Sequence, residues 1–306
     1  MNIHSQKFKD DFGAYFQDLE ISTNDHIKFH KIRNNNLDFF KKVYPLYVLL
    51  ESLSNFRYFI DPSKKILMYQ YAKAGKKDHF VEAARTLFNN DPKSQVLRKG
   101  ILEETFTPYY VELYSDGLML LNQFYLNNYR GCYLMIRCIL EDLYRHIYYK
   151  DHKEEFLMVQ TGISEYDLKL GAEYFRNYLR KASFLNELNQ VDTDFNNLDG
   201  LSEEEIKKKN KFFNLNDELY RKTSAFVHGT NETYLSKFTS NSELEYNKDK
   251  ADSLIEEVGR VINLIVLFLI CAHYEHFSKF NEYEKSLILF NFEIDKRSKL
   301  RRFLNI

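Results

Sequence analysis

The chain has 306 residues, and its 44% hydrophobic and 16% aromatic content is enough for a substantial core, which excludes a wholly disordered protein. Only 10 Gly and 4 Pro residues are present, too few for the many turns of a β-sandwich or an α/β fold. The 43 basic and 44 acidic residues give a formal net charge of −1, so any site for nucleic acid or another polyanion must be a local patch.

The first part of the chain shows short amphipathic patterns. Spaced aromatic residues among charged ones predict two helices within residues 6–42, and Pro45 is predicted to start a further helix that ends near residues 61–62. Residues 63–104 predict shorter helices interrupted by glycine and proline. Together these elements form an expected N-terminal helical region, residues 1–104.

The rest of the chain, residues 105–306, has a denser apolar pattern and predicts a helical bundle with a basic C-terminal helix. The predicted helices cover residues 109–127, 129–149, about 164–188, 213–228, about 250–280 and about 284–304. The expected fold class is therefore all-α, a multi-helix bundle with an N-terminal helical extension. No linker rich in Gly, Pro or Ser separates the two parts, so packing into one body is equally compatible with the sequence.

The cysteines and the most apolar segments indicate a cytoplasmic protein. Cys132, Cys138 and Cys271 form no C-x-x-C pair and lie in apolar helical surroundings, so we expect buried, reduced thiols. The N-terminus lacks the apolar core of a signal peptide. The most apolar stretch, residues 261–272, contains Asn263 and is too short to span a bilayer, so we expect no contact with a membrane.

Arg221 and His228 form the most suggestive pair of residues in the chain. They are seven residues apart on a predicted helix, nearly two turns or roughly 10 Å along the axis, so they share a face with Ser224 or Ala225 between them. His228 precedes Gly229 at the helix end, where the dipole favours a protonated imidazole. A permanent cation and a group that moves protons can cleave RNA without a metal. Equally, the histidine could be a structural cap bonded to a backbone carbonyl, with the arginine simply solvated.

This bundle resembles the HEPN superfamily, whose members include RNA-cutting toxins and effectors of phage defence and CRISPR systems. The family pattern is an arginine, four to six intervening residues and a histidine near the end of a late bundle helix, which Arg221 and His228 match. Arg137 and Glu141 are similar to an R-x3-E pair on an early helix of the family. The resemblance covers roughly residues 105–280. The residues around the pair that are similar to abortive-infection members are Tyr220, Ser224, Val227, His228 and Gly229.

The resemblance implies a metal-independent endoribonuclease in antiviral or stress defence, with Arg221 and His228 as catalytic residues and no cofactor. The 2′-hydroxyl would attack the phosphate and leave a 2′,3′-cyclic phosphate. The substrate would be RNA, for example transfer RNA or another structured RNA. A homodimer is also implied, because two protomers would bring their Arg/His faces into one composite cleft. Glu141, Arg137 and Ser224 are the expected supporting residues.

The chain departs from the family pattern at Lys222, where many active members have Asn or Asp. Several members are non-catalytic binding or assembly domains. The alternative function is therefore a non-catalytic helical module that binds or senses a partner protein, such as a defence-system component or an antitoxin.

Arg137 and Glu141 allow two interpretations of their own. They are four residues apart, which suits an ion pair within one helix that contributes a few tenths of a kcal/mol. Alternatively, Glu141 orients His228 from the neighbouring helix. An inward-facing charged pair on so apolar a helix would need a polar partner.

The C-terminal segment KRSKLRRF is the main basic cluster, and with Lys222 it provides candidate RNA contacts. The candidate arginines are Arg297, Arg301 and Arg302. The same basic residues would also be favourable at the end of a C-terminal helix through the helix dipole alone.

The remaining histidines predict no metal site. His273 and His276 share a helix face, but zinc needs a third ligand that the sequence does not supply nearby, so we expect a solvated or half-buried pair. His146 and His152 lie near the end of the second bundle helix, where we expect capping roles. No P-loop, G-x-G-x-x-G, nucleophile elbow or paired-cysteine motif is present.

Overall fold

The computed structural model describes residues 33–54, 92, 93, 95, 109–160, 171–179, 211–228 and 246–303. Within these ranges every long element is an α-helix and no residue lies in a strand, which confirms the all-α prediction. Of the two helices predicted within residues 6–42, the part before residue 33 lies outside the described ranges, and so does almost all of 63–104. The helices are α2 (Arg33–Ser54), α6 (Tyr110–Tyr125), α7 (Tyr129–Asp151), α8 (Lys153–Gln160), α10 (Ala172–Leu179), α13 (Lys211–His228), α14 (Lys248–Ala272), α15 (Tyr274–Phe277), α16 (Glu282–Ile288) and α17 (Ile294–Phe303).

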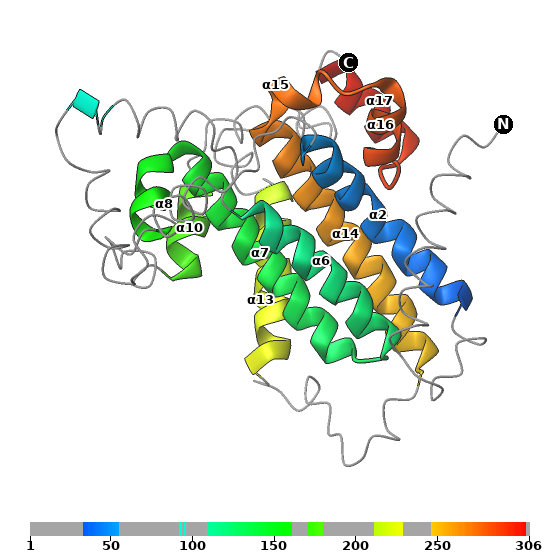
Figure 1. The fold of residues 1–306 in the computed structure, drawn as a ribbon. Helices are drawn as coiled ribbons and strands as arrows, with labels where there is room; N and C mark the ends of the chain where they lie inside the picture. The colour runs from blue at the N-terminus through cyan, green and yellow to red at the C-terminus, as the bar shows by residue number, and fades with distance from the viewer. Residues whose placement is uncertain are drawn as a thin grey trace, which may run out of the picture.

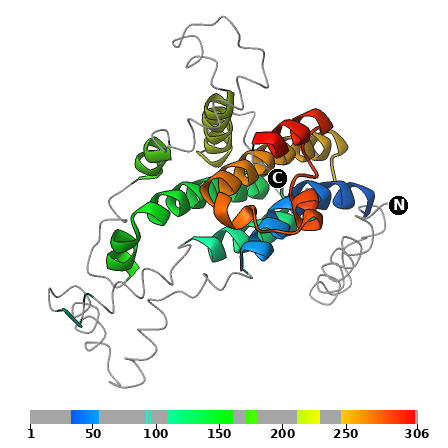
Figure 2. The same ribbon diagram turned by 90° about the horizontal axis from the view of Figure 1, so that it is seen from above.

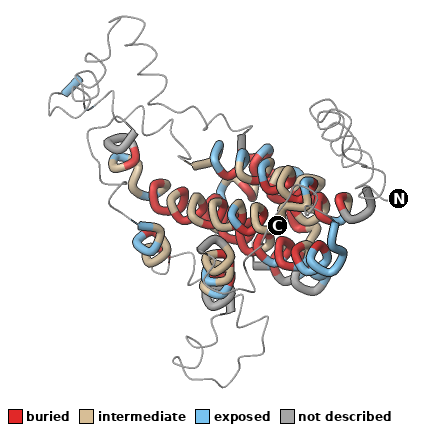
Figure 3. The backbone as a smooth tube through the Cα atoms, turned by 90° about the horizontal axis from the view of Figure 1, so that it is seen from below, coloured by how far each residue is buried: buried red, intermediate tan, exposed pale blue. Residues whose placement is uncertain are grey.

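The bundle is built around α14, which packs against α2, α7 and α13 (Figure 1). Helix α6 lies between α2 and α7 and packs against both. Residues 264–270 of α14 are all buried, as expected for a helix with neighbours on several sides (Figure 3). Each fully buried Leu, Ile, Val or Phe side chain contributes about 1.5–3 kcal/mol, so α14 supplies much of the apolar stabilisation. The shorter α8 and α10 flank the last turns of α7, on the side away from α2 (Figure 2).

The connection between α6 and α7 is the tight break that the sequence predicts at residues 127–128. Asn127 adopts a φ of 55°, in the left-handed region that asparagine tolerates better than most residues. Asn128 then caps α7, because its side chain accepts a hydrogen bond from the backbone N–H of Gly131 at 3.0 Å. The turn makes α6 and α7 an antiparallel hairpin. α13 also runs antiparallel to α7, since Phe226 contacts Tyr133 and Asn216 contacts Tyr144.

The predicted helix start at Pro45 is wrong, because α2 runs continuously from Arg33 to Ser54 with Pro45 inside it. A proline in a helix removes one backbone hydrogen bond and distorts the preceding turn. Here the side-chain amide of Asn291 donates a hydrogen bond to the carbonyl of Lys42 in that turn, at 2.7 Å. Tertiary packing also offsets the proline, since Pro45 and its neighbours Tyr44 and Leu46 are buried.

Replacing Asn291 with alanine is therefore expected to lower the free energy of unfolding by about 1–3 kcal/mol, because the Lys42 carbonyl loses its side-chain donor beside the proline. Urea unfolding followed by circular dichroism measures this change. The same substitution made in a Pro45→Ala background should cost less, since a helix without the proline distortion returns the Lys42 carbonyl to its own backbone donor, the N–H of Leu46. An equal cost in both backgrounds would contradict the link between Asn291 and Pro45.

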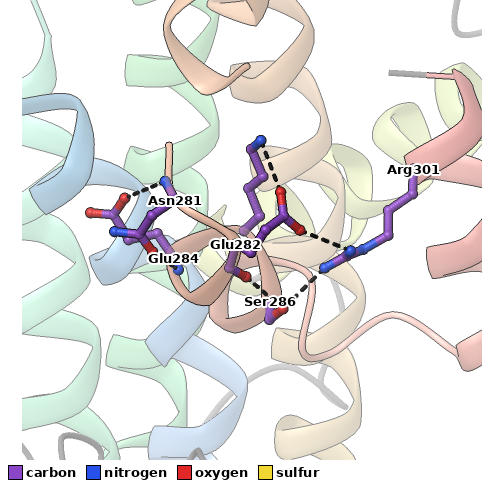
Figure 4. A network of polar contacts seen from close by, with 6 residues as sticks. Asn281, Glu282, Glu284, Ser286 and Arg301 are labelled. Carbon is purple, nitrogen blue, oxygen red and sulfur yellow. Dashed lines mark hydrogen bonds and ion pairs between the residues drawn. The ribbon is translucent and has the colours of Figure 1, made fainter. Parts of the chain in front are cut away.

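The last two predicted helices are also corrected by the structure. The helix expected at about 250–280 ends at Ala272 and is followed by the short α15, and the one expected at about 284–304 is divided into α16 and α17. A reciprocal pair of hydrogen bonds between Asn281 and Glu284 starts α16 as a capping box (Figure 4). The helix expected at about 164–188 is described only as α10, and α8 was not predicted.

The two-part organisation remains a prediction, because residues 104 and 105 lie outside the described part. One helix from the expected N-terminal region, α2, packs against α6, α14 and α16 within the bundle core. Phe39 of α2 stacks on Phe124 of α6 with ring centroids 3.8 Å apart.

Candidate functional site

Helix α13 holds the predicted catalytic pair, and its buried face fixes its orientation. Leu219 and Thr223 are fully buried, and the ring of Phe226 stacks on Tyr133 of α7 at 3.7 Å. Arg221 lies on the exposed flank, where its Nε atom donates a hydrogen bond to the carbonyl of Asp217 at 3.3 Å. The described part of this helix runs to His228, and residue 229, where the sequence predicts the stop, lies outside it. Seven helical residues turn the backbone by about 700°, so positions 221 and 228 lie on the same flank, while the His228 side chain is outside the described part.

The supporting pair Arg137 and Glu141 lies on α7 and faces α13. Nε of Arg137 lies 2.8 Å from Oε1 of Glu141, so the predicted ion pair within the helix is present. The hydroxyl of Tyr220 on α13 donates a second hydrogen bond to the same Glu141 oxygen at 3.2 Å. Glu141 therefore contacts α13 at the residue that precedes Arg221. Its predicted role in orienting His228 stays a prediction.

Helices α7, α10 and α13 meet at a junction around Tyr220, and the sequence did not predict the part that Arg176 and Asp217 play there. Arg176 of α10 places its guanidinium carbon 4.8 Å from the centroid of the Tyr220 ring, and Arg137 makes a similar contact with this ring at 5.4 Å. Nε of Arg176 also lies 3.8 Å from Oδ1 of Asp217. Burial and the nearby Glu141 carboxylate raise the pKa of Tyr220, so the phenol stays a hydrogen-bond donor at neutral pH. Nothing in the local pattern of α10 indicates that it approaches α13.

Ser224 and Lys222 differ in their surroundings. The hydroxyl of Ser224 is buried and makes no hydrogen bond within the described part of the chain. Lys222 points to the other side of α13, where its ammonium bonds to the carboxylate of Glu257 on α14. The departure from the family pattern at this position thus coincides with a contact that ties α13 to α14. The predicted RNA contact of Lys222 stays a prediction.

The C-terminal arginines are largely engaged in holding α17 to α16. Arg301 donates hydrogen bonds to Glu282 at 3.1 Å and to the hydroxyl of Ser286 at 3.0 Å (Figure 4). Nε of Arg297 donates to the carbonyl of Phe292 at 2.6 Å. Arg302 is exposed. Among the described residues, no recorded contact joins these arginines to α13, so RNA binding by α17 stays a prediction separate from the Arg221 flank.

Two histidine predictions are wrong and two are confirmed. His146 is not a cap and His273 is neither solvated nor half-buried, because both are buried between α7 and α14 with their Nε2 atoms 2.7 Å apart. His276, the other member of the expected pair, is half-buried as predicted. His152 does cap α7, with Nδ1 lying 2.9 Å from the carbonyl of Tyr148. Within the described ranges, no group of three or more His, Cys, Asp or Glu side chains could hold a metal ion.

A second titratable cluster lies between α6 and α7. Burial together with the Asp116 charge raises the pKa of Asp142 to about 7, and burial with the Glu112 charge raises the pKa of Asp116. Arg145 lies 3.4 Å from Asp142 and partly offsets this effect. The hairpin brings the two aspartates together, and their sequence separation alone gives no sign of it. Within the described part of the chain, this pair makes no contact with α13, so it is separate from the Arg221 flank.

The cysteine prediction holds only in part. None of the three thiols forms a disulfide, and Cys132 is fully buried, while Cys138 and Cys271 are half-buried. Burial raises the pKa of Cys138 to about 11, with the Asp116 charge adding to the effect, so this thiol is not a reactive thiolate at neutral pH.

None of the described helices is long and apolar enough to cross a membrane. Comparison with protein-family models, with curated proteins and with solved structures gave no match. The main guide to function is therefore the geometry of the flank of α13 that carries Arg221.

Proposed function

We propose that this chain is a HEPN-type, metal-independent endoribonuclease that acts in antiviral or stress defence, with Arg221 and His228 as its catalytic residues. The observation that supports it best is the position of Arg221, which is exposed on the same flank of α13 that ends at His228. Because the one hydrogen bond that Arg221 makes within the described part of the chain uses its Nε, its remaining N–H groups suit a phosphate.

In the proposed reaction, His228 accepts the proton of the RNA 2′-hydroxyl while the 2′-oxygen attacks the adjacent phosphorus. The bond from phosphorus to the 5′-oxygen breaks, and that oxygen takes up a proton. The products are a 2′,3′-cyclic phosphate and a 5′-hydroxyl. Arg221 stabilises the negative charge that develops on the phosphate oxygens. Two copies of the chain would combine their Arg/His flanks, which is the basis for proposing a homodimer.

The test is cleavage of total and transfer RNA in the presence of EDTA. Wild-type protein is expected to cleave, and His228→Ala is expected to lose activity by about 10²–10⁴-fold while it keeps its circular dichroism spectrum. Arg260→Ala is a matched control, because Arg260 is an exposed arginine of α14 that pairs with Glu218 of α13. Intact RNA with every protein would favour the non-catalytic binding module, and full activity of His228→Ala would refute this site.

A further inference from the structure

Arg176 lies at the junction of α10 and α13 with few groups to bind its charge. Its side chain is 15% exposed, and its Nε atom is buried without a hydrogen bond within the described part of the chain. Oδ1 of Asp217 lies 3.8 Å from this Nε, beyond hydrogen-bond distance. Buried guanidinium groups normally satisfy their donors, because leaving a charged donor without an acceptor is costly.

The contact with Tyr220 does not satisfy those donors either. A cation over an aromatic ring is attracted to the face of the ring, and this leaves the N–H groups of the guanidinium available. The guanidinium of Arg137, which also contacts the Tyr220 ring, differs in this respect, because Glu141 accepts its Nε hydrogen bond at 2.8 Å. Arg176 therefore lacks the partner that Arg137 has.

The local charges favour an anion between Arg176 and Arg221. Both arginines contact Asp217, Arg176 near the carboxylate and Arg221 at the backbone carbonyl. Arg137 and Glu141 pair with each other, which leaves the carboxylate of Asp217 near Arg176, while Arg221 bonds to the uncharged backbone carbonyl of Asp217. The excess positive charge lies on the flank of α13 that carries the proposed catalytic arginine.

We propose that Arg176 and Arg221 together bind one phosphodiester group of a single-stranded RNA, with Asp217 between them as the internal competitor for the same guanidinium groups. This inference rests on the proposed function and deepens it, because it assigns substrate binding to α10. Arg176 is then a substrate-binding residue next to the catalytic pair. The chemistry is that of guanidinium and phosphate, which form charge-assisted hydrogen bonds with good geometric fit.

The experiment measures binding of a fluorescein-labelled, fully 2′-O-methylated RNA strand by anisotropy at several salt concentrations. The strand cannot be cleaved, so binding is separated from catalysis. Arg176→Gln is expected to weaken binding roughly tenfold or more and to reduce the salt slope by about 0.7, the value for one lost phosphate contact. Asp217→Asn should instead tighten binding by a few-fold, since it removes the competing carboxylate. Arg260→Gln, the matched control, should bind like wild type.

Opposite effects of the Arg176 and Asp217 variants would support the proposal. Unchanged affinity and salt slope in folded Arg176→Gln would overturn it, and so would equal weakening by Asp217→Asn, which indicates a purely structural pair. If Arg176→Gln does not fold, Arg176→Lys replaces it and should keep the salt slope but lose affinity. Wild-type protein that binds the strand without cleaving ordinary RNA would refute the nuclease proposal alone. The Arg176 assignment would be refuted if wild-type protein cleaves RNA but binds the methylated strand as tightly as Arg176→Gln does. It would also be refuted if wild-type protein does not bind the strand at all.

Discussion

Replacing Lys222 with methionine is expected to lower the free energy of unfolding by about 3 kcal/mol. The ammonium of Lys222 pairs with the carboxylate of Glu257, whose side chain is only 4% exposed. The other carboxylate oxygen of Glu257 is buried and makes no hydrogen bond within the described part of the chain. Methionine keeps a similar volume but leaves a buried negative charge without its partner. The cost is at the low end for such pairs because 34% of the Lys222 side chain is exposed, so water partly replaces the lost ammonium.

Urea unfolding of a double-mutant cycle tests this expectation. The double variant Lys222→Met, Glu257→Leu should recover most of the lost stability, since it removes both charges from the interface of α13 and α14. Arg260→Met is the control for the same pair of helices. Its ion pair with Glu218 has side chains 49% and 61% exposed, so its removal should cost less than about 1 kcal/mol. Equal losses for Lys222→Met and Arg260→Met would show that the buried carboxylate is compensated in another way.

The same variants separate the two roles considered for Lys222. If the role of Lys222 is structural, Lys222→Met should be less stable, and the double variant should recover both its stability and its RNA binding. A direct phosphate contact predicts weaker RNA binding in the double variant as well, because the cation is still missing there.

The sequence predicts local structure well where a helix buries one regular stripe. In α7, Tyr133, Ile136, Leu140, Leu143 and Ile147 recur at helical spacing, and all of them are buried. The start of α7 at Tyr129 is likewise a local feature, marked by the side chain of Asn128 that caps it. Both depend on residues within a few turns of one another, which is the range over which helical periodicity carries information.

The contacts that define the candidate site depend on long-range packing instead. Arg176 approaches Tyr220 from a helix more than forty residues earlier in the chain, and no periodicity connects them. The continuity of α2 through Pro45 has the same cause, because tertiary contacts including the Asn291 bond outweigh the local preference of proline to end a helix. Neither could be predicted without knowing which helices are neighbours.

Lowering the pH from 7.5 to 5 is expected to remove about 2 kcal/mol from the free energy of unfolding for each of His146 and His273. Their Nε2 atoms are 2.7 Å apart, so one hydrogen is shared between them and a further proton would create a buried cation. Burial, with a smaller effect from Lys150, lowers the pKa of His146 to about 3. Burial also lowers the pKa of His273 well below its ordinary value, and His146, Lys150, His276 and Lys153 add to this.

The direction follows from which state binds more protons. In the unfolded chain both histidines titrate near about 6.5, while in the folded protein they stay neutral to much lower pH. Below about pH 6.5 the unfolded state therefore binds more protons, and the stability present above this value is lost as the pH falls. The double variant His146→Gln, His273→Gln removes this effect, since its amides do not titrate. Relative to wild type, it should become more stable by about 4 kcal/mol between pH 7.5 and 5.

Asp142 acts in the opposite direction and must be separated from the histidine pair. Burial and the Asp116 charge raise its pKa to about 7, so the folded state holds a proton that the unfolded state releases above about pH 4. Asp142 therefore adds stability as the pH falls through 7, which partly hides the histidine effect in the wild-type curve. Asp142→Asn should lose more unfolding free energy than wild type as the pH falls from 7.5 to 5. The double histidine variant should instead gain unfolding free energy over this range. Urea unfolding at pH 7.5, 6.5, 5.5 and 5 measures the free energy of unfolding of all three proteins. The histidine variant removes the loss of stability in acid, and Asp142→Asn removes the gain. An identical dependence on pH in all three proteins would therefore mean that neither buried cluster titrates in this range.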